Sequence, residues 1–433
     1  MQRLIIKNFG PIEDLDMEVK DFMLFIGPQA SGKSTIAKAV YFFKSLKEDV
    51  LRYFLEQFES DEFDDFSAFR GIVHTKISNF LIARSVHQKG IIEFYYSDNT
   101  WVKYSIHKDY RNVEISEKFE QLFSYLIGLI KSYVEEQKNR ILLAESQIEK
   151  ISSETKKKLL VYEIGRKVNE QFGDDKETLF IPAVRTFATV LSRHLDDYKF
   201  WARTDYLMRE FMQEINSIKS SFDKSLEELA EEKIVLTKEK NSHVVELAQQ
   251  LIHNILRGDY TFDKYEERLR ISEDKYLPIK HISSGQQESL WILLLIYLKI
   301  LYEKNIFLVI EEPEAHLFPE AQKHIMELVA LLFNTTDSQV MITTHSPYIL
   351  SSVNNLLYAG KLGKTKNGKV NALIDSKLWI DVDRTDAMYV HRPGTPPESI
   401  MDREQAMIKV ERLDEISEVI NAEFDKLMDI EFE

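Results

Sequence analysis

The feature that most constrains this chain is a glycine-bearing loop at residues 27–35, GPQASGKST, set between an apolar run and a helical pattern. The run FMLFI at 22–26 has the length of a buried strand, and the helical pattern extends from about Lys33 to Leu46. The loop fits the spacing G-x-x-x-x-G-K-[ST], in which glycines let successive backbone N–H groups surround phosphate oxygens. A chance match is the alternative reading. Since the strand and helix that the motif needs are both present, the sequence predicts a phosphate-binding loop.

The loop assigns a task to each of its positions. Lys33 is expected to reach the β- and γ-phosphates of a nucleotide, and the Ser34 hydroxyl is expected to ligate Mg²⁺. The start of the following helix adds a partial positive charge. We therefore expect ATP and Mg²⁺ as cofactors, although the motif alone indicates only a P-loop NTPase. The expected ATP-binding residues are Gly27, Pro28, Gln29, Ala30, Ser31, Gly32, Lys33, Ser34 and Thr35.

Two adjacent carboxylates follow a second apolar run, IFLVI at 306–310. Open α/β sheets bind their ligands at the carboxyl ends of strands. We expect Glu311 to bind Mg²⁺, directly or through water, and Glu312 to polarise the attacking water as a general base. The alternative is a solvated acidic turn. Glu311 is a departure from most P-loop NTPases, which carry Asp at the metal position.

Two weaker signals complete the pattern. Residues 281–287 read HISSGQQ before an apolar helix, and residues 341–347 read MITTHSP, with His345 after an apolar run. Serine and glycine are ordinary helix-start residues, and a lone histidine is more often structural than functional. Their order along the chain, after the phosphate loop and around the acidic strand end, is what makes them informative.

With these motifs in this order, the chain resembles an ABC-type ATPase head of the RecF/SMC/OLD-like class. It is most similar to the standalone AAA15/AAA21 ATPases of prokaryotic defence systems and to the ATPase half of OLD proteins. The resemblance implies an α/β fold, namely a P-loop NTPase head with a mixed sheet, covering helices and an inserted helical arm. The resembling segments are NFGPI at 8–12, GPQASGKST at 27–35, ISSGQQ at 282–287, EEPEAHLFPEAQ at 311–322 and TTHSP at 343–347.

The same resemblance implies roles for residues outside the phosphate loop. Residues 282–286 match the signature LSGGQ, with Ser284 in place of a glycine. This signature is implied to contact ATP held by the opposite subunit, and its residues are Ser283, Ser284, Gly285 and Gln286. His345 matches the switch histidine beside the γ-phosphate, and residues 314–317 match a dimer-contacting loop. The implied catalytic residues are thus Glu312, Lys33 and His345.

One further residue, Arg185 in the segment FIPAVR at 180–185, is expected either to contact the nucleotide or to pair with an acid. For the chain as a whole we expect four segments. Residues 1–110 form the N-terminal part of the head with the phosphate loop, and residues 111–270 form a largely helical insertion with a head-like strand near 179–185. Residues 271–360 carry the signature, the acidic strand and the switch histidine. Residues 361–433 form a C-terminal segment with an acidic amphipathic helix.

Three packing expectations accompany this division. The helical stretches 115–170 and 205–256 are expected to pair as an antiparallel arm. Residues 361–369, KLGKTKNGK, are expected to form a basic glycine-bearing loop. The apolar stripe of the tail 411–430 either packs on its own head or docks a partner.

Composition excludes several classes of protein. The 433 residues include no cysteine, so disulfides, thiolate metal sites and Cys nucleophiles are ruled out. The net charge of −15 counts against a general nucleic-acid binder, although a local basic face stays open. The first residues lack a secretory pattern, and the apolar run 291–302 is shorter than the roughly 20 residues of a membrane span. We therefore expect a cytoplasmic protein without a membrane partner.

The functional expectation is ATP-gated dimerisation with slow hydrolysis. The partners implied are a second copy, as a homodimer or a higher even-numbered assembly, and an effector protein, a nuclease, in prokaryotic anti-phage defence. About 85 residues follow His345, too few for a complete Toprim nuclease domain, and the D-x-D at 381–383 is better explained as an acidic turn. The alternatives are a RecF-like DNA-repair ATPase that binds nucleic acid, a non-hydrolysing ATP-bound scaffold, and a complete nuclease in one chain.

Overall fold

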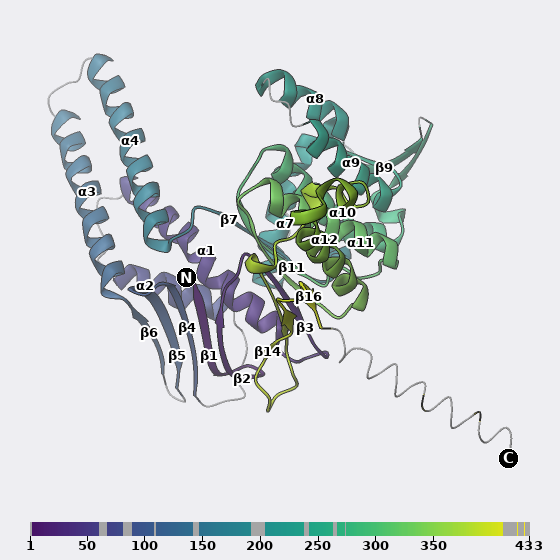
Figure 1. The fold of residues 1–433 in the computed structure, drawn as a ribbon. Coiled ribbons are helices and arrows are strands. Elements are labelled where there is room, and N and C mark those ends of the chain that lie inside the picture. Colours follow the sequence, from purple (N-terminus) through teal and green to yellow (C-terminus); the bar gives the residue numbers. More distant parts are fainter. Residues whose placement is uncertain are drawn as a thin grey trace.

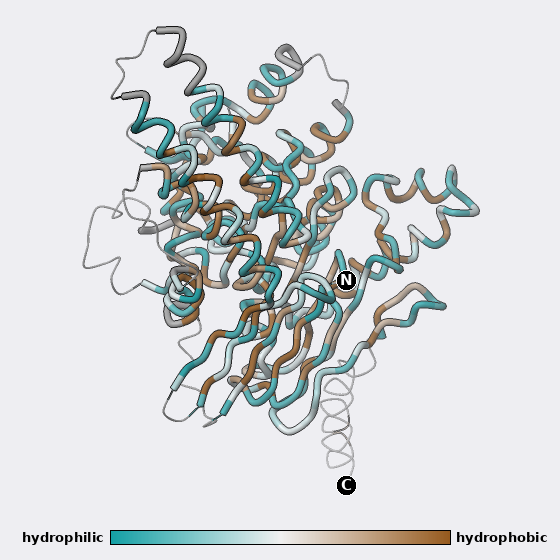
Figure 2. The backbone as a smooth tube through the Cα atoms, turned by 90° about the vertical axis from the view of Figure 1, so that its left-hand side faces the viewer, coloured by the Kyte–Doolittle hydropathy of each residue, from teal (hydrophilic) through white to brown (hydrophobic). Residues whose placement is uncertain are grey.

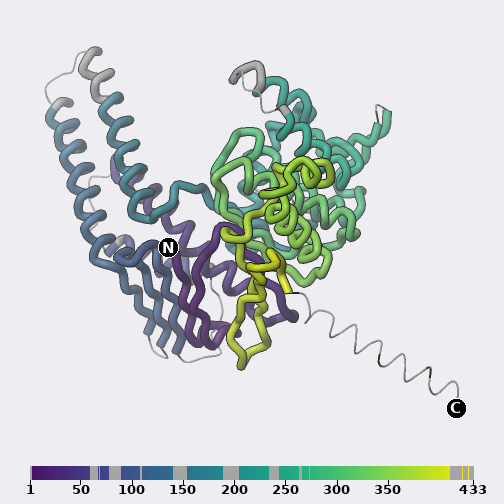
Figure 3. The backbone as a smooth tube through the Cα atoms, in the orientation of Figure 1, coloured from purple at the N-terminus to yellow at the C-terminus, as the bar shows by residue number. Residues whose placement is uncertain are grey.

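The computed structural model shows a mixture of strands and helices in which early and late segments of the described residues lie side by side (Figure 1). The described residues are 2–59, 67–80, 89–107, 110–141, 147–191, 204–237, 242–262, 266–272 and 274–409, with the single positions 422 and 428. The purple N-terminal strands lie beside the yellow C-terminal ones (Figure 3), where β3 pairs with β13. The first and last parts of the described chain therefore build one sheet. The predicted tail helix at 411–430 lies outside the described residues, apart from those two positions.

The six-stranded sheet at the centre has the order β14-β13-β3-β12-β11-β7. Its strands are β3 (Phe22–Ile26), β7 (Glu177–Ile181), β11 (Ile306–Glu311), β12 (Gln339–Thr344), β13 (Thr385–Tyr389) and β14 (Glu398–Ser399). The first five pair in parallel, and β14 pairs antiparallel to β13. Parallel strands present their carboxyl ends at one edge of a sheet. The expected mixed α/β sheet is confirmed, and it brings the segments after β3, β11 and β12 to the same edge.

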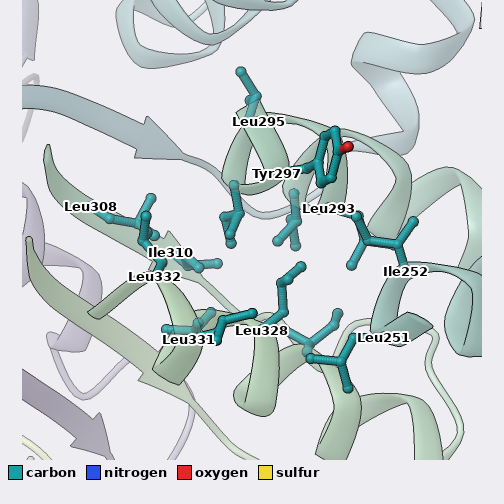
Figure 4. Packing of buried hydrophobic residues seen from close by; sticks show 14 of the residues in the cluster. Leu251, Ile252, Leu293, Leu295, Tyr297, Leu308, Ile310, Leu328, Leu331 and Leu332 are labelled. Carbon is teal, nitrogen blue, oxygen red and sulfur yellow. The ribbon is translucent and has the colours of Figure 1, made fainter. Parts of the chain in front are cut away.

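Both faces of this sheet are buried, which explains why its strands read as continuous apolar runs. Along β11, Ile306, Leu308 and Ile310 enter one apolar cluster, whereas Phe307 and Val309 enter the other. The first cluster, part of which is shown in Figure 4, includes residues of the helices α10 (Ser284–Leu301), α11 (Pro319–Thr335) and α12 (Pro347–Asn371). The second cluster includes residues of the helix α1 (Lys33–Glu56).

The apolar run at 291–302 falls almost wholly within α10. Residues 287–298 of this helix are all buried, and residues 290–298 belong to the first cluster, as expected for a core helix. Within the described part of the chain, no helix has both the length and the apolar character needed to cross a membrane.

A second sheet covers α1 from the other side, in the order β2-β1-β4-β5-β6. Its antiparallel strands are β1 (Arg3–Phe9), β2 (Ile12–Glu18), β4 (Gly90–Ser97), β5 (Thr100–Ile106) and β6 (Arg111–Ile115). Hydrophobic and hydrophilic residues alternate along these strands (Figure 2), as in a sheet with one buried face. Strands β4 and β5 pair as a hairpin that turns at residues 97–100.

The two helical stretches do not pair with each other as predicted. Helices α3 (Glu117–Ile141) and α4 (Gln147–Phe172) pack together as a projecting hairpin (Figure 1), and this hairpin is the inserted arm. Helix α9 (Ser242–Leu256) instead packs on α10 and α11. The reason is that each stretch buries its apolar face in a different cluster: Phe119 and Phe123 pack with α1, whereas Ala248 and Leu251 pack with α10.

The predicted loop at 361–369 is also wrong, because α12 continues through these residues with a local kink at Lys366, where φ is −130°. The helix lies close against the segment that follows it. A Cβ added to Gly363 would lie 2.0 Å from the Trp379 ring, so the glycine serves close packing. The basic residues of this segment are consistent with a solvated helix face as well as with a loop.

Smaller elements complete the described fold. The helices are α2 (Ser67–Phe80), α5 (Thr186–Leu191), α7 (Tyr206–Lys219) and α8 (Leu226–Thr237). A three-stranded sheet contains β8 (Asp259–Phe262), β9 (Glu267–Ser272) and β10 (Lys275–Pro278), and a final pair contains β15 (Met401–Asp402) and β16 (Met407–Ile408).

Candidate functional site

The phosphate loop lies between the end of β3 at Ile26 and the start of α1 at Lys33, as predicted. Gly27 has φ of 151°, and a Cβ at this position would lie 2.1 Å from the carbonyl oxygen of Val390. Only glycine allows the residue after β13 to approach this closely. Ala30 and Gly32 also have positive φ, at 61° and 110°. Positive-φ positions within so short a loop are typical of the backbone nests that bind anions.

Lys33 folds back over this loop. Its Nζ donates hydrogen bonds to the carbonyl oxygens of Gly27 and Pro28, each at 2.9 Å. The side chain is buried, and this burial lowers the pKa of Lys33 to about 8, with partial compensation from the carboxylates of Glu312 and Glu314. The carboxylates after β11 therefore act electrostatically on the Lys33 ammonium group.

Glu311 ends β11 as a buried carboxylate, with 5% of its surface exposed. Its Oε1 atom has no hydrogen-bond partner and lies 4.0 Å from Lys38 Nζ on α1. A buried carboxylate oxygen without a hydrogen bond fits a hard cation such as Mg²⁺. The described residues contain no group of three or more His, Cys, Asp or Glu that could hold a metal ion. A Mg²⁺ ion here would therefore need Glu311, the exposed Ser34 hydroxyl, water and the nucleotide's own phosphates.

Glu312 and His345 are brought together although they are separated by 33 positions in the sequence. Glu312 Oε1 lies 3.6 Å from His345 Nε2. Glu312 has φ of 47°, and its N–H donates to the carbonyl oxygen of Thr343 at 2.8 Å. A left-handed conformation in a residue other than glycine is a strained one that recurs at functional sites.

Glu314 belongs to the site and was assigned in the sequence only to a dimer-contacting loop. Its Oε1 accepts a hydrogen bond from the backbone N–H of His345 at 2.7 Å, and its Oε2 is buried without a partner. Glu314 thus fixes the segment that carries His345. Sequence spacing gives no signal for this contact, because the two residues meet only when β11 and β12 pair.

The signature residues start α10. Ser283 caps the helix: its Oγ accepts from the N–H of Gln286 at 3.3 Å, and Gln286 Oε1 accepts from the N–H of Ser283 at 3.0 Å. This is a capping box, so the ordinary helix-start role applies to both residues. A Cβ on Gly285 would lie 2.7 Å from the carbonyl oxygen of His316, so the turn rests directly on the loop after β11. Ser283 and Ser284 are exposed.

The signature is not joined to the phosphate loop of its own chain. Among the described residues, no hydrogen bond or ion pair connects Ser283, Ser284, Gly285 or Gln286 with residues 27–35. The structure therefore brings the segments after β3, β11 and β12 to one sheet edge, whereas the signature is exposed at the start of α10.

Arg185 pairs with an acid, which was one of its two expected roles. It has no exposed surface, and its Nε lies 3.4 Å from Glu288 Oε2 on α10. Its guanidinium also donates to the carbonyl oxygens of Glu311 at 2.7 Å and Glu312 at 2.9 Å. At the D-x-D, the Asp381 side chain accepts from the N–H of Asp383 and starts a short 3-10 turn over Val382–Arg384, so this segment has the geometry of a capped acidic turn.

A phosphate loop between a parallel strand and a helix, with carboxylates and a histidine at the neighbouring strand ends, defines a P-loop ATPase of α/β fold. Residues 1–350 match the family AAA_15, described as an AAA ATPase domain, and the chain belongs to this family. No curated protein is matched by the chain.

The solved structures to which the chain is similar include SMC heads. An SmcHead bound to the C-winged helix domain of ScpA has a TM-score of 0.44 and 10% identity, over 93% of this chain and 98% of that chain. An Smc head with an extended coiled coil, bound to the C-terminal domain of ScpA derived from Pyrococcus furiosus, has a TM-score of 0.40 and 13% identity, over 97% and 100%. The SMC head domain from Thermotoga maritima has a TM-score of 0.38 and 10% identity, over 92% and 98%.

Proposed function

We propose that this protein binds and hydrolyses ATP at a site that two copies of the chain complete together. The observation that carries the proposal is the meeting of Glu312 and His345, 3.6 Å apart, at the sheet edge that also bears the phosphate loop. A carboxylate and a histidine placed beside a phosphate nest supply the groups that phosphoryl transfer to water needs, namely one that orients water and one that contacts the transferred phosphate.

The proposed roles follow from position. The backbone N–H groups of residues 27–35 and the ammonium group of Lys33 hold the β- and γ-phosphates. Ser34 and Glu311 hold Mg²⁺, which neutralises developing charge on the phosphates. Glu312 accepts a hydrogen bond from the attacking water and takes its proton, while His345 contacts the γ-phosphate and Glu312.

The proposal that ATP is shared between two copies is supported by the exposed signature, which among the described residues has no hydrogen bond or ion pair to its own phosphate loop. The exposed Ser283 and Ser284 are free to face the phosphate loop of a second copy. There the N-terminus of α10 would point at the γ-phosphate, where the helix dipole favours an anion. An isolated chain then holds an incomplete site, and hydrolysis is slow until the dimer forms.

The same proposal extends to a biological role. The ATP-dependent dimer regulates a partner effector, a nuclease, in prokaryotic anti-phage defence, and this part rests on the resemblance to standalone defence ATPases. A plaque assay in cells carrying the native gene neighbourhood tests it with wild type and Lys33→Ala. Equal plating on both strains would refute the defence role while leaving the ATPase proposal intact.

The dimer is tested by light scattering on wild type and Glu312→Gln, with and without Mg-ATP. We expect the variant to gain a stable dimer or a larger even-numbered assembly with ATP, because it binds without hydrolysing. Lys33→Ala is the matched control and should show the same mass with and without ATP. A mass of the Glu312→Gln protein that does not change with ATP would refute the shared site.

A further inference from the structure

Arg185 combines complete burial with a set of hydrogen bonds to backbone acceptors. It lies in the loop after β7, the edge strand that pairs with β11. Its guanidinium donates to the carbonyl oxygens of Pro182 at 3.0 Å, Glu288 at 2.8 Å, Glu311 at 2.7 Å and Glu312 at 2.9 Å. A guanidinium presents its N–H donors in a rigid planar fork, so these four acceptors are held in fixed relative positions.

The backbone around Glu312 is held on both sides. In the peptide unit before it, the Glu311 carbonyl accepts a hydrogen bond from Arg185, and the Glu312 N–H donates to the carbonyl of Thr343. The peptide unit after it has its carbonyl bonded to Arg185 as well. The strained φ of 47° at Glu312 persists where surrounding contacts determine it. Arg185 thereby fixes the direction in which the Glu312 carboxylate leaves the backbone.

The other end of this network is on the signature helix. Glu288 lies in the first turns of α10, is 2% exposed, and accepts a hydrogen bond from the Arg185 N–H at 2.9 Å. The donor of that bond is the backbone N–H of Arg185, and the second Glu288 oxygen accepts from the backbone N–H and the hydroxyl of Thr186, at 3.0 and 2.7 Å. A displacement at the start of α10 therefore reaches Arg185 directly, and through it the carbonyls of Glu311 and Glu312.

We propose that Arg185 is a positioning residue that sets the orientation of Glu312 and, through Glu288, links the signature end of α10 to that carboxylate. The inference rests on the proposed ATPase, in which Glu312 is the general base. In a shared site, the signature of one chain contacts the ATP bound by its partner, while Glu312 of that chain acts on the ATP bound by its own phosphate loop. The Arg185–Glu288 pair then couples the two ATP sites of the dimer.

Arg185→Lys tests the positioning role, because lysine keeps the charge but cannot reach four separate carbonyls with a planar fork. We expect kcat for ATP hydrolysis to fall at least 30-fold, which corresponds to about 2 kcal/mol in the activation free energy. The Kd for ATP should change by less than threefold, and ATP should still drive the same change in mass. Thr186→Val is the matched control: it removes a hydrogen bond to Glu288 but leaves the carbonyls of Glu311 and Glu312 engaged, and should keep kcat within threefold.

Combining Arg185→Lys with Glu312→Gln separates positioning from general structural damage. If Arg185 acts through Glu312, the double variant should hydrolyse ATP no more slowly than Glu312→Gln alone. Losses that multiply, or an equal loss of ATP affinity and kcat in Arg185→Lys, would overturn the proposal. If the wild-type protein hydrolyses no ATP, the proposed function fails. If the wild-type protein is active and Arg185→Lys is equally active, only the positioning role of Arg185 fails.

Glu288→Gln tests the link to α10 and also serves if Arg185→Lys does not fold. It keeps the size of the side chain and removes the charge that faces Arg185. We expect the Hill coefficient for ATP hydrolysis to fall from above 1 in wild type to about 1, with the Kd for a non-hydrolysable ATP analogue unchanged. An unchanged coefficient, or a wild-type coefficient of 1, would overturn the coupling.

Discussion

Raising the pH should weaken ATP binding, because Lys33 loses its proton within the range of ordinary experiments. Burial lowers its pKa to about 8, although the carboxylates of Glu312 and Glu314 act in the opposite direction. Bound phosphates bring negative charge to the ammonium group and raise the pKa again. Nucleotide binding therefore takes up a proton when the free protein is deprotonated, so the affinity is highest below pH 8 and falls as the pH rises through 8.

The magnitude follows from that pKa. Lys33 is about half protonated at pH 8 and about one-tenth protonated at pH 9 in the free protein. If only the protonated form binds well, the Kd should rise about twofold between pH 7 and pH 8 and about tenfold between pH 7 and pH 9. At pH 8.5, binding should take up about 0.8 proton per site.

Isothermal titration calorimetry in buffers of different ionisation enthalpy measures both quantities. Lys33→Arg should bind with a flat pH profile, because the guanidinium keeps its proton. Glu312→Gln removes one of the carboxylates that raise the pKa of Lys33, so its loss of affinity should begin at lower pH. A wild-type Kd that is constant from pH 7 to pH 9, with no proton uptake at pH 8.5, would refute the reasoning.

Two further predictions concern glycines. Gly363→Ala should destabilise the protein by about 1–3 kcal/mol, because its Cβ would lie 2.0 Å from the Trp379 ring. Gly368→Ala lies in the same helix, where an added Cβ would meet nothing within 4 Å, and should stabilise the protein by about 0.5–1 kcal/mol. Chemical denaturation measures the free energy of unfolding of both variants. The same change in both would contradict a continuous helix through these residues. Gly285→Ala should abolish ATP-driven assembly in light scattering while ATP still binds, because its Cβ would lie 2.7 Å from the His316 carbonyl and displace the signature turn. Retained assembly would argue against this surface as the interface.

The parts of the site that could be predicted from the sequence are those encoded by neighbouring residues. The phosphate loop needs glycines at fixed spacing between a strand and a helix, and all of these lie within residues 22–46. The carboxylates after β11 were expected at a strand end, since β11 reads as a buried strand on its own. Their meeting with His345 depends in addition on β11 and β12 being adjacent parallel strands, which the structure shows.

What could not be predicted depends on contacts between distant residues. The spacing of apolar residues in the two helical stretches shows that each has a buried face, but not which partner covers it. Residues 361–369 have loop-like composition, yet they form a helix whose glycine packs on Trp379. Glu314 and Arg185 contact backbone groups, which every residue possesses, so no residue type elsewhere in the sequence identifies their partners.

A buried ion pair is generally weak support for a fold, because an apolar pair of similar volume is often as stable. Arg185 is an exception for a geometric reason. The turn that aims Glu312 at His345 directs the carbonyls of Glu311 and Glu312 into the interior, and Glu288 and Pro182 add two more. A leucine at position 185 would leave these acceptors unsatisfied, at about 1–3 kcal/mol each. The arginine is therefore required by the conformation that Glu312 adopts. Stability and the placement of the proposed base depend on the same side chain, so substitutions there should be judged by kcat and affinity together with folding.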